Sequence, residues 1–225
     1  MKLRENVLDN PVWNALKDIH SQHSIDYGQV KFYKTDFTPF GASINNQDTS
    51  KAIEAHSKLI KEFFIVGEKP KLPAHFAPLI KYVGLQMIIY NRIDYPITES
   101  ILELNKNHYK DLMTLVKLVY PHFFKAKTNT LGRYFGIYKN NTLVAITGER
   151  MQTQHFTEIS GVITHPDHLG NGYAKQLVAY TANKIFDSGK TPFLHVDQNN
   201  IGPINLYKKL GFVVRRKLHF WKISC

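Results

Sequence analysis

The chain has 225 residues, of which 43% are hydrophobic, 12% aromatic and 21% charged, a balance that excludes a disordered or collagen-like chain. It carries 29 Lys and Arg against 18 Asp and Glu, and the resulting net charge of +11 favours anionic partners. Cys225 is the one cysteine, so no disulfide can form within the chain, which is typical of a reducing compartment.

Neither a signal peptide nor a membrane helix is expected. Asp9 and Asn10 interrupt the start of the chain before the apolar core of a signal peptide could form. The longest apolar runs, near Phe63–Val66 and Met87–Tyr90, are far shorter than the ~20 residues of a bilayer-spanning helix. We therefore predict a cytoplasmic protein without a membrane partner, and the sequence leaves its oligomeric state open.

Residues 1–98 form the first of two predicted units. Apolar periodicity predicts two helices and three strands in this smaller α/β region. The helices are Val12–His20 and Thr49–Phe63, and the strands are Val30–Tyr33, Phe63–Gly67 and Leu85–Tyr90. No constellation of catalytic side chains stands out here, so we expect a structural or substrate-shaping unit.

Residues 99–225 form the second predicted unit. Its expected elements, in chain order, are strand Ile101–Leu104, helix His108–Val119, strands Arg133–Tyr138, Leu143–Met151 and Phe156–Thr164, helix Asn171–Ser188, strand Phe193–Val196, helix Pro203–Leu210 and strand Phe212–Ile223. This order predicts a mixed α/β layer fold of the α+β type, with a mixed central sheet.

A glycine-rich loop lies between the strand Phe156–Thr164 and the following helix. Residues 164–174 read THPDHLGNGYA, and such a turn lets backbone N–H groups converge on an anion at the positive end of the helix dipole. Two common nucleotide motifs do not fit, because Lys175 stands where a dinucleotide fingerprint needs Gly or Ala, and Lys184 where a P-loop needs Gly. An ordinary strand–helix turn is the alternative.

Two segments resemble signatures of the GNAT acyltransferase superfamily. The loop resembles Q/R-x-x-G-x-G/A, with Gly172 and Ala174 in the last two fixed positions and Leu169 in place of Gln or Arg. Residues 200–212 are similar to N-x-x-A-x-x-L-Y-x-K-x-G-F, with Pro203 in place of Ala. The resemblance covers roughly residues 99–225, and the sequence of residues 194–212 is similar to that of the glycine N-acyltransferase-like branch.

The resemblance implies a GNAT fold that binds acetyl-CoA. In this family, main-chain groups of one strand bind the pantetheine arm and the glycine loop binds the pyrophosphate. The matching residues are Val162, Ile163 and Thr164 for the strand and Leu169, Gly170, Asn171, Gly172, Tyr173, Ala174 and Lys175 for the loop. Asn200 matches an asparagine that touches the cofactor, although capping of the helix that follows is an alternative role.

The resemblance also implies an N-acetyltransferase that acts on a primary amine by direct attack. Tyr207 matches the tyrosine that donates a proton to the departing thiolate; a packing tyrosine is the alternative. Glu158 lies where some members carry a glutamate that deprotonates the amine directly or through water, but a solvated strand carboxylate is equally compatible. Other candidates for the base are Glu149, His155 and His195.

Two other function classes stay open. One is a protein of the same fold that binds acyl-CoA without turnover, and the other is a basic nucleic-acid-binding module. The second is disfavoured because the basic residues are scattered and no recognition motif accompanies them. We therefore expect a small-molecule or peptide amine as partner, no nucleic acid, and no metal, because the histidines lack a recognisable ligand spacing.

Overall fold

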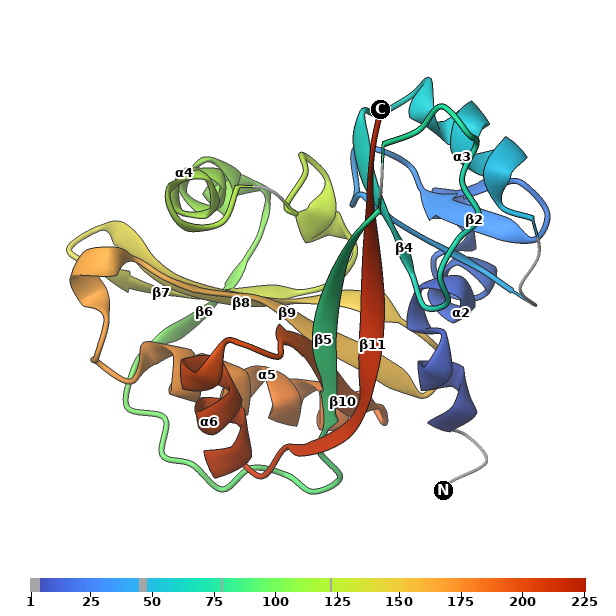
Figure 1. The fold of residues 1–225 in the computed structure, drawn as a ribbon. Coiled ribbons are helices and arrows are strands. Elements are labelled where there is room, and N and C mark those ends of the chain that lie inside the picture. The colour runs from blue at the N-terminus through green and yellow to red at the C-terminus, as the bar shows by residue number, and fades with distance from the viewer. Residues whose placement is uncertain (1–4, 45–47, 78, 122) are drawn as a thin grey trace.

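We describe a computed structural model, which covers residues 5–44, 48–77, 79–121 and 123–225. Eleven strands of these residues form one sheet in the order β1-β2-β3-β4-β11-β5-β10-β9-β8-β7-β6 (Figure 1). The strands are β1 (Ser24–Asp26), β2 (Val30–Tyr33), β3 (Phe40–Ser43), β4 (Glu62–Val66), β5 (Ile80–Ile88), β6 (Ile101–Leu104), β7 (Tyr134–Lys139), β8 (Thr142–Gln152), β9 (Phe156–Thr164), β10 (Thr191–Asp197) and β11 (Val213–Ser224).

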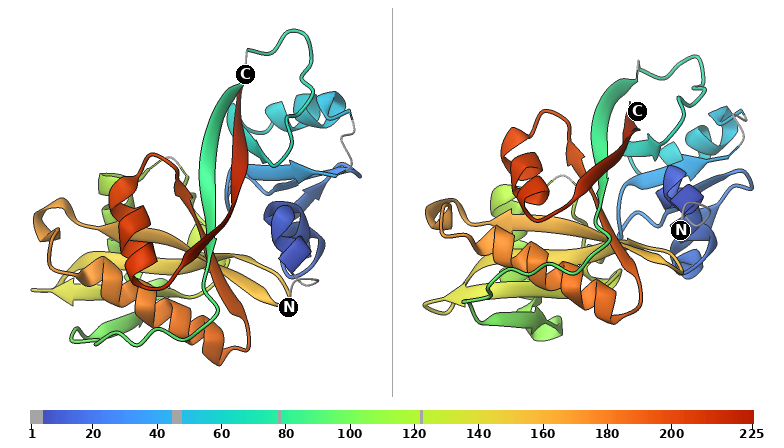
Figure 2. Two further views of the ribbon diagram at one scale, coloured as in Figure 1. Left: turned by 60° about the horizontal axis from the view of Figure 1, so that its bottom comes forward. Right: turned by 90° about the horizontal axis from the view of Figure 1, so that it is seen from below.

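Helices cover both faces of the sheet. The α-helices are α2 (Pro11–Lys17), α3 (Ser50–Ser57), α4 (Tyr109–Val119), α5 (Tyr173–Asp187) and α6 (Ile201–Lys209). Short 3-10 turns are η1 (Asn6–Asp9), η2 (Ser21–His23), η3 (Lys106–His108), η4 (Thr128–Thr130) and η5 (Pro166–His168). α4 packs on one face of the sheet, as Figure 1 shows, whereas α5 and α6 lie together on the other face, which is turned forward in Figure 2.

The predicted element order of residues 99–225 is confirmed, and so is the mixed α/β class. Asn140 and Asn141 have φ angles of 48° and 61°, the left-handed pair that a type I′ turn requires between β7 and β8. Helix α6 begins at Ile201, two residues before the predicted start. Pro203 fits inside its first turn because N–H groups there have no partner within the helix.

The N-terminal region is less regular than expected. The two predicted helices end early, at Lys17 and Ser57, and the strands β1 and β3 were not predicted. The long strand β5 lies between β10 and β11, pairing antiparallel with both. Strands from either side of the predicted boundary near residue 98 therefore share one sheet.

Two pairs of neighbouring strands run parallel, β3 with β4 and β9 with β10. In the described parts of the chain, no helix combines the length and the apolar character needed to cross a bilayer.

A close contact between β7 and β8 gives a test of this packing. A Cβ atom at Gly148 would lie 2.3 Å from Cε1 of the buried Tyr134 ring. We expect Gly148→Ala to lower the free energy of unfolding by about 1–3 kcal/mol, because the ring has no room to move. Thermal unfolding measures this as a lower Tm.

Gly202 in α6 provides the matched control, since a Cβ there meets nothing within 4 Å. Gly202→Ala is expected to keep or raise the Tm, because alanine favours a helix. Equal Tm values for wild type and Gly148→Ala would contradict the close approach of the Tyr134 ring to Gly148.

Candidate active site

Strands β9 and β10 part in the middle of the sheet. Their parallel pairing runs from Thr191 opposite Phe156 to Leu194 opposite Ile159 and goes no further. Beyond Ile159, β9 keeps pairing with β8 through to Thr164, with an irregular register where Gly161 adopts a φ of +61°. The edge of residues 160–164 that faces away from β8 therefore has no strand partner among the described residues.

A recess of about 380 Å³ lies at the far end of this free edge. It gathers the end of β9 and the glycine loop, namely Thr164, Leu169, Gly170, Asn171, Gly172, Tyr173, Ala174 and Lys175. Gly170 and Gly172 have φ angles of +82° and +75°, and Gly172 caps the N-terminus of α5. A Cβ built on either glycine meets nothing within 4 Å, so the loop is open to a ligand. Helix α6 closes the other side with Gly202, Asn205, Leu206 and Lys209.

Three predicted binding residues lie outside this recess. Val162 and Ile163 lie on β9, along its free edge, with Ile163 buried and Val162 partly buried against the α5–α6 core. Asn200 occupies the N-cap position of α6, but its side chain accepts no hydrogen bond from that helix. Asn200 therefore occupies the capping position of α6, but its side chain does not cap the helix.

Tyr207 lies on the α5–α6 face, below the point where the strands part. Its ring is 7% exposed and packs edge-on against Phe212, in a cluster that includes Ile159 and Leu194. Burial raises the pKa of Tyr207 to about 12, so its hydroxyl stays protonated at neutral pH. Within the described chain, that hydroxyl makes no hydrogen bond, which leaves it available to a ligand.

Glu158 lies on the opposite face of β9 and is fully buried. Its Oε2 accepts from Nε of Arg150 at 2.8 Å, and its Oε1 accepts from Nη2 of Arg150 at 2.8 Å. Oε1 also lies 2.8 Å from Nδ1 of His195. Burial by itself would raise the pKa of Glu158, but the Arg150 charge and these hydrogen bonds hold it well below its usual range.

Gln86 fixes the tautomer of His195. Oε1 of Gln86 accepts from Arg215 at 2.9 Å, so the amide nitrogen must point the other way. That nitrogen donates to the Leu8 carbonyl at 2.8 Å and to Nε2 of His195 at 3.1 Å. Because Nε2 accepts, Nδ1 carries the proton and donates it to Glu158.

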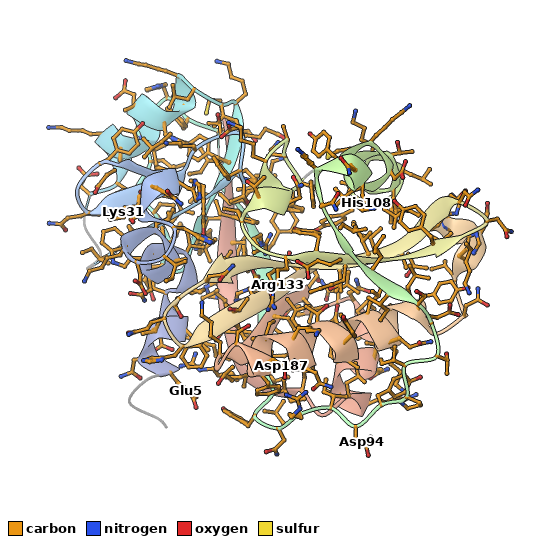
Figure 3. The ribbon with its side chains drawn as sticks, turned by 180° about the vertical axis from the view of Figure 1, so that it is seen from behind. Glu5, Lys31, Asp94, His108, Arg133 and Asp187 are labelled. Atoms are coloured by element: carbon orange, nitrogen blue, oxygen red, sulfur yellow. The ribbon has the colours of Figure 1, made fainter. Side chains whose placement is uncertain are left out.

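The other predicted candidates for the base lie apart from this cluster. Glu149 is buried, and its Oε1 accepts from Nε and Nη2 of Arg133 at 2.9 and 2.5 Å. Arg133, labelled in Figure 3, also donates to the Lys184 carbonyl of α5 at 3.1 Å. His155 precedes β9, at the end of that strand remote from Thr164.

A second recess, which we call the aromatic cavity, opens on the Glu158 face. It has a volume of about 230 Å³, and β10 lines it with His195, Val196 and Asp197, the residues just beyond the last pair with β9. Its aromatic wall consists of Phe40, Phe64, Tyr82, Tyr120, Phe123 and Phe220. Each of the two parted strands thus lines one recess: Thr164 of β9 lines the glycine-loop recess, and residues 195–197 of β10 line the aromatic cavity.

Comparisons with known proteins identify the fold. Residues 134–221 match the family model of FR47-like proteins, a segment that contains both signatures found in the sequence. A GNAT-family structure from Novosphingobium aromaticivorans DSM 12444 superposes with a TM-score of 0.84 at 27% identity, covering 96% of this chain and 97% of that one. The chain has the GNAT fold. The resemblance inferred from the two signatures is confirmed.

Two more distant structures share the GNAT fold over nearly the whole chain. A GCN5-related N-acetyltransferase-like protein from Streptococcus suis 89/1591 has a TM-score of 0.67 at 13% identity, covering 98% of this chain and 97% of that one. A GCN5-related N-acetyltransferase from Kribbella flavida has a TM-score of 0.65 at 12% identity, covering 97% and 94%. No curated protein matches the sequence. The glycine N-acyltransferase-like branch stays a prediction.

Sequence reasoning missed several residues of this candidate site. Arg150 could have been found, because it is a basic residue on the predicted strand that directly precedes the strand of Glu158. The indication was weaker for Asp197, which is the polar residue directly after the predicted strand Phe193–Val196. The aromatic wall had none, since its residues come from separate segments. Among the described residues, no three His, Cys, Asp or Glu side chains gather as a metal site.

The Arg150–Glu158 pair can be tested by stability. Arg150→Met leaves the buried Glu158 carboxylate without its counter-charge, and we expect the free energy of unfolding at pH 7 to fall by about 3–5 kcal/mol. Arg150→Met combined with Glu158→Gln removes both charges and is expected to recover part of that loss. Urea unfolding measures each variant.

Arg92→Met is the matched control, because Arg92 pairs with Asp187 at 2.6 Å on the surface, where the ion pair is screened and its loss should cost little.

Because the folded pKa of Glu158 lies below its ordinary value of 4.5, its stabilising effect is complete above pH 4.5 and fades as the pH falls below it. The difference between wild type and Glu158→Gln should therefore shrink in acid; a pH-independent difference would contradict the assigned ion pair.

Proposed function

We propose that the protein is an N-acetyltransferase that transfers the acetyl group of acetyl-CoA to a primary amine. The observation that carries this proposal is the parting of β9 and β10, which leaves residues 160–164 without a strand partner on one edge, with the glycine-loop recess at Thr164 and the aromatic cavity at residues 195–197. A cofactor held at the first recess can reach, between the parted strands, an acceptor held in the second. The family fold, together with both signatures, supports the same reaction.

The glycine loop would hold the cofactor's pyrophosphate. Backbone N–H groups around Gly170 and Gly172 lie at the N-terminus of α5, where the helix dipole favours an anion. Lys175 and Lys209 line the same recess and add positive charge. The exposed Leu169, in place of a polar family residue, leaves this binding to the main chain and the lysines.

The pantetheine arm would lie along residues 162–164. Their unpaired backbone groups can hydrogen-bond to the amides of the arm as an added strand would. This places the thioester between β9 and β10, with Tyr207 on one side and the aromatic cavity on the other. The neutral amine attacks the carbonyl carbon from the cavity, the new C–N bond forms, and the C–S bond breaks as Tyr207 donates its proton to the thiolate.

The geometry favours an indirect role for Glu158. Both of its oxygens already accept hydrogen bonds from Arg150 and His195, and its lowered pKa makes it a weak proton acceptor. Glu158 was expected to deprotonate the amine either directly or through water, and direct contact with the amine would break those hydrogen bonds. We propose that Glu158 orients His195 at the cavity wall and that the amine proton leaves through water.

Acetyl-CoA binding is the first test. At 100 times its dissociation constant, a ligand adds about 2.7 kcal/mol of stability, which raises the Tm of a chain this size by roughly 5–11 °C. We expect this rise with acetyl-CoA, and a smaller one with the same concentration of ATP. Equal rises with the two ligands would count against the assignment of the cofactor.

A glycine pair gives the matched variants for that experiment. Gly172→Ala and Gly28→Ala both place alanine at a left-handed φ, +75° and +79°, with open space around the new Cβ. Both should lower the Tm of the free protein to a similar extent. Only Gly172→Ala should also lose the acetyl-CoA-dependent rise, because only Gly172 lies in the glycine loop.

Tyr207→Phe tests the catalytic step. We expect kcat to fall by about 10²-fold or more, the usual effect of removing a general acid, while the Kd of acetyl-CoA stays within about twofold. Release of the CoA thiol in the presence of amines measures the rate, and calorimetry measures the binding. A protein that binds acetyl-CoA but releases no thiol with any amine would instead be a non-catalytic acyl-CoA-binding protein.

A further inference from the structure

The aromatic cavity selects for a flat, apolar acceptor. The rings of Phe40 and Phe123 stack with their centroids 5.8 Å apart at 17°, and those of Tyr120 and Phe123 are 5.3 Å apart at 27°. The ring of Phe64 is tilted by 42° against that of Phe123, with centroids 5.2 Å apart. A wall of contacting rings gains most from burying another aromatic or planar apolar group.

The end of the aromatic cavity at Asp197 carries surplus negative charge. Arg150 lines it, but its charge is balanced by Glu158, and its guanidinium lies 4.8 Å above the Phe40 ring. Asp197 is exposed at the same end, beside the parting strands, and forms no ion pair with any described residue. One Asp197 oxygen accepts the Asn199 N–H at 2.7 Å, which holds the carboxylate in place. An ammonium group is therefore favoured at this end.

The outer end carries surplus positive charge. A neighbouring recess adjoins the aromatic cavity through Phe64, Tyr82 and Phe123, and we call the two recesses together the groove. Lys222 lines this outer part, where it pairs with Glu62 at 2.6 Å. Lys125 lines it too and makes no ion pair with the described residues, so an anionic group is favoured here.

We propose that the acceptor is a small primary amine with an aromatic body and an anionic group at the end remote from the amine. The proposal rests on the proposed acetyltransferase function and names its substrate class. Asp197 binds the ammonium end before the proton is lost, and Lys125 binds the anion. A simple α-amino acid cannot bridge the groove because its two charges are adjacent, and a polyamine would place positive charge beside Lys125.

The test compares four amines with acetyl-CoA by thiol release: 4-(2-aminoethyl)benzoate, 2-phenylethylamine, spermidine and glycine. We expect the highest kcat/KM for 4-(2-aminoethyl)benzoate, about tenfold above 2-phenylethylamine, as one charge-assisted hydrogen bond provides. Asp197→Asn should lower kcat/KM for both aromatic amines. Lys125→Gln should lower it for the benzoate alone and so remove the preference.

Two surface variants serve as controls. Asp94→Asn changes an exposed carboxylate on the loop that precedes β6, labelled in Figure 3, and Lys110→Gln changes an exposed lysine of α4. Neither residue lines the groove, so both variants should keep the wild-type preference.

The outcomes separate this inference from the proposed function. Acetylation of glycine or spermidine in preference to the aromatic amines, or an equal effect of Lys125→Gln on the two aromatic amines, overturns the inference and leaves the acetyltransferase function intact. If no amine releases thiol, calorimetry of 4-(2-aminoethyl)benzoate with the CoA-saturated protein decides. If the wild-type protein binds this amine and Asp197→Asn abolishes the binding, the groove binds the amine without catalysis. If the wild-type protein does not bind it, the groove assignment is refuted.

Discussion

The parting of β9 and β10 is the feature on which the rest of the site depends. The two strands share four residue pairs and then separate after Ile159 and Leu194. Separation leaves backbone groups of β9 open to an extended ligand and turns residues 195–197 of β10 toward a cavity. Continued pairing of β9 with β10 would have satisfied those groups. The chemistry of the site is thus a consequence of hydrogen bonds that the fold leaves unmade.

Burying the Glu158 carboxylate behind the site costs free energy, which hydrogen bonds and an ion pair with residues from distant segments offset. Glu158 is balanced by Arg150 and accepts from His195, whose other nitrogen accepts from Gln86. Gln86 belongs to the N-terminal half and is itself fixed by Arg215 near the C-terminus. The N-terminal region therefore contributes Gln86 to the back of the candidate site and Phe40, Phe64 and Tyr82 to the aromatic wall, and its role in shaping a substrate stays a prediction.

Local patterns were enough to predict the glycine loop and the elements of residues 99–225, because left-handed glycines, apolar periodicity and turn residues act within a few positions. Strand β1 has three residues, too few for a periodic signal, and β3 reads FGAS, in which Gly41 and Ala42 are residue types depleted in strands. The contact of Glu158 with His195 and that of Gln86 with His195, 109 positions apart, depend on the sheet order, which no local pattern encodes. The aromatic wall was unpredictable for the same reason.

The position of β5 bears on how the chain reaches its native state. Both neighbours of β5 come from more than 100 residues later in the sequence, so the sheet centre is assembled from contacts with a high closure entropy. Until residues 213–224 are in place, β4 and β5 each present an open edge. Such edges pair readily with other chains, and folding intermediates should accordingly be the species most prone to aggregate.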